Sequence, residues 1–170
     1  ILDCLKKQDF ASGLVLLNNY MEKKPDNIKL LNLRANVYST LRQHDKAVND
    51  LKNAIRIAPS LLELHYNLGN EYSRLGNHYA AIRSFKKALE IDPTNLSALF
   101  NIGNALMKNG QYGEAATKYK DVLEIEPDHA ACTANLLRCY AKAKAYEEFS
   151  DKSMKILGSR PTTSEAQGLR

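Results

Sequence analysis

Several features that would place a protein in a membrane or secreted class are missing from this sequence. No apolar run approaches the roughly 18 residues that a membrane-spanning helix needs, so we expect no membrane insertion. The three cysteines, Cys4, Cys132 and Cys139, are odd in number and lack the spacing of a disulfide framework. Nothing resembles a signal peptide. The cysteine pattern predicts reduced thiols and a cytoplasmic location.

Residue patterns that carry catalysis are also missing. The eight glycines are scattered, and no glycine-rich phosphate loop is present. None of the four histidines has a partnered nucleophile that the sequence can place. His129 with Cys132 and Cys139 lacks a fourth ligand and matches no zinc spacing. The sequence therefore predicts no enzymatic activity, no cofactor and no metal site.

The charge balance is positive but dispersed. The net charge is +5 and the pI is about 9.0. The basic doublets, such as Lys23-Lys24 and Lys86-Lys87, fall on different parts of the chain and alternate with acids such as Glu22 and Glu90. Scattered charge of this kind is typical of solvated faces, so we expect no nucleic-acid partner. With 44% hydrophobic residues the chain can bury a core.

Proline is scarce as well, and its placement is regular. The five prolines are Pro25, Pro59, Pro93, Pro127 and Pro161, and each follows the previous one by 34 residues. Because proline cannot continue a helix and restricts the residue before it, each proline marks the end of one unit and the start of the next. A period between about 20 and 50 residues is typical of stacked-repeat proteins.

The proline phase divides the chain into units. We expect a partial first unit at residues 1–27, complete units at 28–61, 62–95 and 96–129, a divergent unit at 130–161 and a tail at 162–170. In each complete unit, apolar residues recur every three or four positions on both sides of a central turn. This indicates two amphipathic helices in a hairpin. In the partial unit, residues 1–6 match the end of a first helix, and Phe10 to Lys23 reads as the second.

The last unit departs from the others. Leu137 stands in the column that Gly69 and Gly103 occupy one and two periods earlier, so we expect the two helices of this unit to sit farther apart. In the tail, Thr162 and Glu165 have the spacing of a capping box. We therefore expect a fragment whose tail begins a truncated further helix.

Two runs one period apart carry the most specific motif. They are Tyr66-Asn67-Leu68-Gly69-Asn70, followed by Tyr72, Ala81, Phe85, Ala88 and Asp92-Pro93, and Phe100-Asn101-Ile102-Gly103-Asn104, followed by Ala115, Tyr119 and Glu126-Pro127. Both resemble near-consensus units of the tetratricopeptide repeat (TPR) family. The resemblance implies an all-α fold, a right-handed α-solenoid of antiparallel helix hairpins, with the first helix of every hairpin on the concave surface.

Small residues recur where the two helices of a hairpin would touch. Gly69 with Ala81, and Gly103 with Ala115, allow two helix backbones to approach closely, while Phe85 fills the space beside that contact. A bulkier residue there would overpack the hairpin, typically at a cost of about 1–3 kcal/mol.

Three polar columns lie on the first helices. They are Asn67, Asn101 and Asn135; Asn36, Asn70 and Asn104; and Arg74, Lys108 and Lys142. Helix interiors do not favour asparagine. An amide that both donates and accepts is suited to the backbone of an extended peptide, and O-linked N-acetylglucosamine transferase has a similar asparagine ladder in its repeats. The alternative is that these asparagines belong to the average repeat of the family, where some brace neighbouring helices.

Further side chains in the same groove indicate what kind of peptide would bind there. Tyr66 and Phe100 are candidates for contact with apolar ligand side chains, with packing inside the fold as the alternative. Arg138 adds to the basic column and favours an acidic peptide.

A carboxylate clamp for a peptide terminus is not expected. Asn36 and Asn67 match the two asparagine positions of such a clamp in the family. Its cationic positions are occupied instead by Asn32, Ser97 and Asn101, which removes the main anchor of a terminal carboxylate.

The sequence thus predicts a protein-interaction scaffold that holds an extended segment of a partner in its concave groove. Two alternatives remain open. One is the substrate-recruiting arm of a larger enzyme, such as a glycosyl- or sulfotransferase. The other is self-association into a homo-oligomer through an exposed end of the array, for which the last unit offers little apolar surface.

Overall fold

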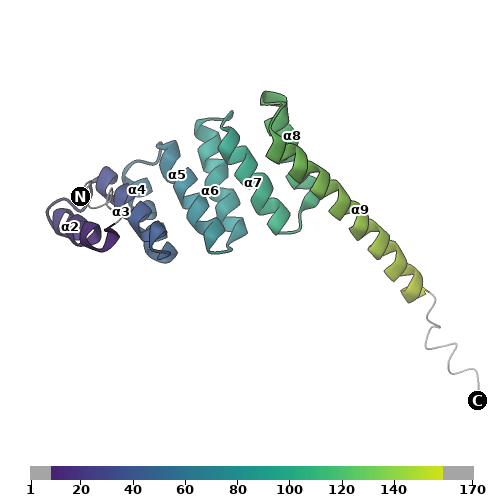
Figure 1. Cartoon of the computed structure of the whole chain (residues 1–170), viewed down its shortest axis with the longest axis horizontal. Helices are drawn as coiled ribbons and strands as arrows, with labels where there is room; N and C mark the ends of the chain where they lie inside the picture. Colours follow the sequence, from purple (N-terminus) through teal and green to yellow (C-terminus); the bar gives the residue numbers. More distant parts are fainter. Residues whose placement is uncertain (1–8, 159–170) are drawn as a thin grey trace, which may run out of the picture.

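The computed structural model describes residues 9–158, with side chains through residue 145. Within those residues the chain folds into eight α-helices and no strand: α2 (Phe10–Lys23), α3 (Ile28–Thr40), α4 (His44–Ile57), α5 (Leu62–Arg74), α6 (His78–Ile91), α7 (Leu96–Lys108), α8 (Tyr112–Ile125) and α9 (Ala130–Gly158). The helices succeed one another along the long axis of the molecule (Figure 1). The all-α solenoid expected from the sequence is confirmed. The expected end of a first helix at residues 1–6 lies outside the described residues.

Local sequence explains where these helices begin and end. α2, α4, α6 and α8 each end two residues before a proline. Asparagine caps several helix starts: the side chain of Asn27 accepts from the Leu30 N–H at 3.1 Å, and that of Asn95 accepts from the Ala98 N–H at 3.0 Å. Such caps satisfy N–H groups that have no partner inside the helix.

The turn inside each hairpin depends on one left-handed residue. Gly76 has φ 74° and Gly110 has φ 79°. Arg42, one period before Gly76, adopts φ 58° although it is not glycine. Glycine adopts this backbone region without strain, whereas a residue with a Cβ is strained there. The first complete hairpin therefore turns at some cost in stability.

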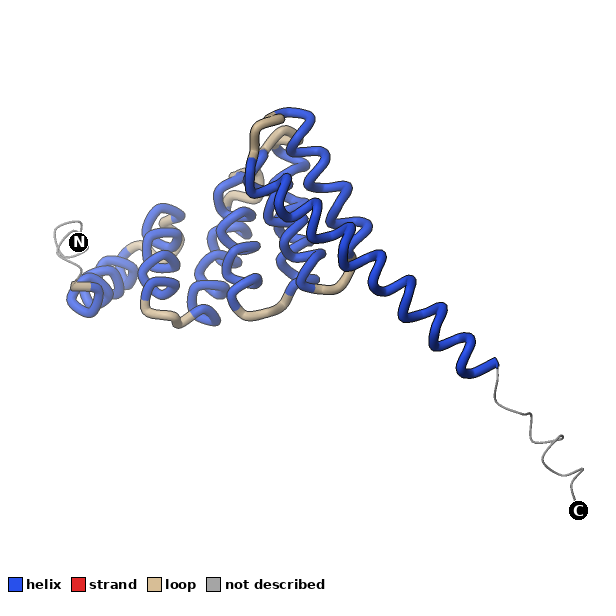
Figure 2. The backbone as a smooth tube through the Cα atoms, turned by 45° about the vertical axis from the view of Figure 1, so that its right-hand side comes forward, coloured by secondary structure: helices blue, strands red, loops and turns tan. Residues whose placement is uncertain are grey.

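The last expected hairpin is not formed, which corrects the sequence-based expectation of two helices in residues 130–161. Residues 130–158 are one continuous 29-residue helix, α9. Lys144 stands in the column of Gly76 and Gly110, and its neighbours Ala143 and Ala145 are strong helix formers, so nothing interrupts the helix. The second half of α9 projects beyond the stacked helices (Figures 1 and 2). Leu137 is 64% exposed. The expected capping box at Thr162 lies outside the described residues.

The core runs along the array between successive helices. One cluster of buried side chains extends from Met21 to Leu68, and the next from Ala81 to Cys139. Ala81 and Ala115 are completely buried. The two clusters, which both contact Tyr72, hold α3, α5, α7 and the first half of α9 side by side and so place their polar columns in one surface.

Candidate peptide-binding groove

Asparagines on successive first helices hydrogen-bond to one another. The Nδ2 of Asn101 on α7 donates to the Oδ1 of Asn70 on α5 at 3.2 Å. The Nδ2 of Asn135 on α9 donates in the same way to the Oδ1 of Asn104 on α7 at 3.1 Å. These two cross-repeat pairs have the same separation in sequence, so they repeat with the period of the array. Four predicted site residues are thus brought together in two equivalent pairs that brace neighbouring repeats.

The first complete hairpin uses a different partner. The Nδ2 of Asn67 donates to the Oδ1 of Asn32 at 3.1 Å rather than to Asn36. Asn32 in turn donates to the Oε1 of Glu63 at 2.8 Å. Asn32 therefore acts as a link between α3 and α5, and Asn36 is left exposed at the edge of the groove.

Tyrosine hydroxyls complete the asparagine pairs. The hydroxyl of Tyr66 accepts from the Nδ2 of Asn101 at 3.1 Å. The hydroxyl of Tyr119 donates to the Oδ1 of Asn104 at 2.8 Å and accepts from the Nδ2 of Asn135 at 3.4 Å. Burial raises the pKa of the Tyr119 phenol well above its usual value. Tyr119 therefore remains a neutral donor that orients the asparagine amides.

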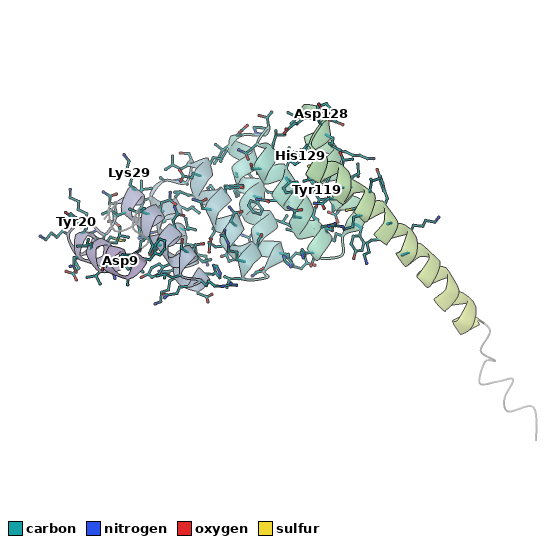
Figure 3. All side chains as sticks on the ribbon, viewed as in Figure 1. Asp9, Tyr20, Lys29, Tyr119, Asp128 and His129 are labelled. Atoms are coloured by element: carbon teal, nitrogen blue, oxygen red, sulfur yellow. The ribbon has the colours of Figure 1, made fainter. Side chains whose placement is uncertain are left out.

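Phe100, which occupies the column of Tyr66, has no hydroxyl and contributes packing. Its ring centroid lies 5.9 Å from that of Tyr119 and 5.3 Å from that of His129. Tyr119 and His129 lie at the end of the array where α8 and α9 meet (Figure 3). The ring of Tyr66 packs similarly against Phe85, with centroids 5.7 Å apart. Both rings are half-buried and belong to the fold as much as to the groove surface.

Each cross-repeat pair leaves one amide NH₂ group without a hydrogen bond to another described side chain, and the first pair also leaves an amide oxygen. The pair on α5 and α7 leaves the Nδ2 of Asn70 and the Oδ1 of Asn101. In the pair on α7 and α9, the Nδ2 of Asn104 is left, whereas the Oδ1 of Asn135 accepts from Arg138 at 3.3 Å. These side chains are partly exposed, so the remaining polar atoms are open to a ligand.

A hollow of about 230 Å³ lies in the groove between α3 and α5. Four predicted site residues line it: Asn36, Asn67, Asn70 and Arg74. The hollow also contains Glu71, a residue that the sequence analysis did not single out. The structure thus adds a carboxylate to a surface that was expected to be amide-lined and basic.

Glu71 is buried and held by three side chains. It is only 4% exposed. Its Oε1 accepts from the Ser39 hydroxyl at 2.8 Å, and its Oε2 lies 2.8 Å from the Nδ1 of His44. Arg74 forms an ion pair with the same carboxylate. The sequence contains one signal for this cluster, because the other repeats from residue 28 onward hold uncharged residues in the column of Glu71, namely Val37, Ala105 and Cys139.

The basic edge expected along the groove is uneven as a result. Arg74 is bound to the Glu71 carboxylate, which neutralises its charge at the α5 position. Lys108 on α7 and Lys142 on α9 are exposed, and Arg138 on α9 is exposed beside Asn135. The unpaired positive charge of the groove therefore lies toward α9.

The histidine and cysteines near the start of α9 have structural roles. The Nδ1 of His129 accepts from the Cys132 backbone N–H at 3.2 Å, as a helix cap does. Cys132 and Cys139 are buried, and burial raises the pKa of both thiols. Among the described residues, no three histidine, cysteine or acidic side chains gather where they would hold a metal ion. In the same part of the chain, no helix combines the length and apolarity needed to cross a bilayer.

Solved structures with the same arrangement of helices are TPR proteins. A crystal structure of MamA protein superposes with a TM-score of 0.79 at 18% identity, covering 92% of this chain and 85% of that one. YrrB, described as a TPR protein with an unusual peptide-binding site, superposes with a TM-score of 0.73 at 22% identity, covering 98% and 87%. The first TPR of Spaghetti (RPAP3), bound to the HSP90 peptide SRMEEVD, gives 0.64 at 24% identity, covering 69% and 93%. At these identities the likeness concerns the fold.

Comparison with sequence families addresses membership directly. No curated protein sequence matches the chain significantly. Four family models described as tetratricopeptide repeat match residues 28–61, 62–95, 84–116 and 106–170. Together they extend from residue 28 to residue 170, and the first two coincide with the units that the prolines mark off at 28–61 and 62–95. The chain belongs to the tetratricopeptide repeat family.

Proposed function

We propose that this protein is a protein-interaction scaffold that holds an extended peptide of a partner in the groove formed by α3, α5, α7 and the first half of α9. The observation that carries the proposal is the composition of the asparagine pairs. The pair of Asn70 and Asn101 leaves one amide NH₂ and one amide oxygen facing solvent. The next pair repeats this NH₂ at Asn104.

Such a ladder matches the chemistry of a peptide backbone. Every residue of an extended peptide other than proline presents one C=O and one N–H. An amide NH₂ donates to the peptide C=O, and an amide oxygen accepts from the peptide N–H. Neither contact depends on the side chains of the peptide. Because the donors and acceptors are already oriented by their cross-repeat bonds, little side-chain entropy is lost when the peptide binds.

The uneven charge of the groove indicates which part of the bound peptide should be acidic. Lys108, Lys142 and Arg138 make the α9 end of the groove basic, whereas the charge of Arg74 is neutralised by Glu71 at the other end. A partner segment whose acidic residues lie over α7 and α9 is therefore favoured. We infer a cytoplasmic scaffold of this kind that has no catalysis of its own. The peptide bound to the RPAP3 domain and the peptide-binding site described for YrrB support this class of function.

A pull-down on a peptide array tests the proposal. The wild-type chain is compared with a variant carrying Asn67→Ala, Asn101→Ala and Asn135→Ala, and with a second variant carrying Asn70→Asp and Asn104→Asp. Both variants are expected to lose peptide capture while circular dichroism shows unchanged helicity. The second variant separates ligand binding from the bracing role, because aspartate keeps the side-chain oxygen that accepts each cross-repeat bond and replaces only the unused NH₂ group.

The matched control replaces asparagines away from the groove, Asn19 on α2 and Asn49 on α4, which are both exposed. Asn19→Ala with Asn49→Ala is expected to capture the same peptides as wild type. Affinity that is unchanged in both groove variants would show that the ladder does not bind peptide.

A further inference from the structure

A second and larger groove lies between α4 and α6, over α5. Its volume is about 550 Å³. Its lining residues come from all three helices: Lys52 and Ile55 on α4; His65, Leu68 and Tyr72 on α5; and Ala80, Arg83, Ser84, Lys86, Lys87 and Glu90 on α6. None of them belongs to the asparagine columns.

This outer groove faces away from the asparagine groove. An α-helix makes one turn in about 3.6 residues, so positions two residues apart point to nearly opposite sides. On α5 the asparagine groove uses Asn67 and Asn70, whereas the outer groove uses His65, Leu68 and Tyr72. A ligand in one groove therefore does not compete for space in the other.

The outer groove is strongly basic along its rim. Lys52, Arg83, Lys86 and Lys87 line it, with Glu90 as the single carboxylate. Lys87 forms an ion pair with Glu90 at 2.7 Å. Among the described side chains, Arg83, Lys86 and Lys52 form no ion pair, so three positive charges lack an opposite charge.

The floor of the groove is apolar. Leu68 is buried, and Ile55 and Tyr72 are half-buried on either side of it. The Nζ of Lys52 lies 5.7 Å from the centroid of the Tyr72 ring and covers that aromatic face. A ligand that uses the whole groove must therefore offer carboxylates to the rim and an aliphatic or aromatic side chain to the floor.

The charge of this groove is not repeated in the next groove of the array, between α6 and α8. One period later, the positions of Ala80, Arg83 and Lys87 hold Glu114, Thr117 and Asp121. The equivalent positions between α6 and α8 together carry three cations and three carboxylates, namely Lys86, Lys118 and Lys120 with Glu114, Asp121 and Glu124. Lys118 is also paired with Asp121 at 2.5 Å. The next groove along the array is thus neutral.

We propose that the outer groove between α4 and α6 binds an acidic peptide segment of a partner protein, with one large apolar side chain seated on Leu68 and carboxylates paired with Arg83, Lys86 and Lys52. A nucleic-acid ligand is less well matched. Its backbone needs a basic track of many phosphate contacts, and its bases need free aromatic faces. Here the next groove along the array is neutral, so the cations do not continue as a track toward α8, and Lys52 covers the Tyr72 ring.

Fluorescence polarisation with a labelled peptide tests the proposal. The probe has about twelve residues, with aspartate and glutamate flanking a central Leu-Phe pair. We expect binding that weakens at least about tenfold when Arg83→Glu and Lys86→Glu are combined, and that weakens as salt is raised. Both residues are exposed, so the variant should fold, and Arg83→Gln with Lys86→Gln provides a milder test.

The neutral groove supplies the matched control. Lys118→Glu with Lys120→Glu makes the same charge change one repeat later and should leave the affinity within about twofold of wild type. Equal losses in the two double variants would overturn the proposal, because general electrostatic attraction would then explain the binding. A peptide with Ser-Ser in place of Leu-Phe should bind at least about tenfold more weakly, and equal affinity would overturn the role of the apolar floor.

Two further measurements locate the ligand and its class. A benzophenone group in place of the central phenylalanine should crosslink to α4, α5 or α6 at Ile55, Leu68 or Tyr72. Crosslinks to Asn101 or Asn135 would place the peptide in the asparagine groove and overturn the proposal. An oligouridine RNA is run beside the peptide, and RNA binding without peptide binding would assign the groove to nucleic acid instead.

Discussion

The ring of Phe85 occupies the space that a side chain at position 69 would need. A Cβ placed on Gly69 would lie 2.5 Å from the Cε1 of Phe85. The same relationship recurs one repeat later, where a Cβ on Gly103 would lie 2.7 Å from the Cε1 of Tyr119. Glycine on the first helix is thus the complement of a buried aromatic ring on the second.

Substitution of Gly69 is therefore expected to destabilise the array. Gly69→Ala should lower the free energy of unfolding by about 1–3 kcal/mol, because the completely buried Phe85 ring has little room to move. Adding Phe85→Leu should recover part of the loss, since the first complete hairpin combines Ala35 with Leu51 in these columns. Urea denaturation measures both effects, and equal midpoints for Gly69→Ala and wild type would refute the packing scheme.

Arg42 offers a stabilising substitution. Its φ of 58° is strained for a residue with a Cβ. Arg42→Gly should raise the free energy of unfolding by about 1 kcal/mol. Gly76→Ala is the converse control, because a Cβ there has open space but the φ of 74° is unfavourable, so a loss of similar size is expected. Thermal unfolding of both variants tests the pair, and a destabilised Arg42→Gly would contradict the argument.

His44 and His78 occupy one column but have opposite environments. The Nδ1 of His44 lies 2.8 Å from a Glu71 oxygen, whereas the Nδ1 of His78 is buried without a partner among the described residues. The difference arises in the following repeat. Ala105 stands one period after Glu71, so His78 has no carboxylate at the position where His44 has one.

Replacement of each histidine by phenylalanine should separate the two environments. His78→Phe removes a buried polar atom that lacks a hydrogen bond, so it should raise the free energy of unfolding by about 1 kcal/mol. His44→Phe leaves Glu71 with fewer partners and should lower it by about 1–3 kcal/mol. Chemical denaturation of the two variants side by side checks the prediction, which fails if both change in the same direction.

Burial at the start of α9 links stability to alkaline pH. It raises the pKa of the Cys132 and Cys139 thiols above their ordinary value of 9.0 and that of the Tyr119 phenol above 10.0. The folded chain keeps these protons at pH values where the unfolded chain has released them. Their contribution to stability is therefore complete below about pH 9 and is lost as the pH rises through the folded pKa values.

Urea unfolding at a series of pH values from about 7 to about 10 measures this loss. The double variant Cys132→Ala with Cys139→Ala should show a shallower decline than wild type above about pH 9, although it is less stable at neutral pH. A decline of the same steepness in both proteins would assign the effect to other groups.

The regular part of the fold was predictable because its signals are local. Prolines, capping asparagines and helical periodicity act within a few residues of the chain, and α2 has the bounds that the sequence predicts, Phe10 to Lys23. The prediction failed at α9, where the 34-residue period was given more weight than local helix propensity. Lys144 in the turn column was the warning, because it favours a continuing helix and disfavours a left-handed turn.

The sequence by itself determined the period, the hairpins of the complete units and the rows of asparagine on the first helices, since these follow from spacing along one chain. Only the tertiary structure decided which polar groups are used and which are left for a ligand. The bond between Asn70 and Asn101, the burial of Glu71 against His44 and the charged groove over Leu68 all join residues from different helices. Their geometry depends on how neighbouring hairpins stack, and that stacking is set by side-chain packing in the core.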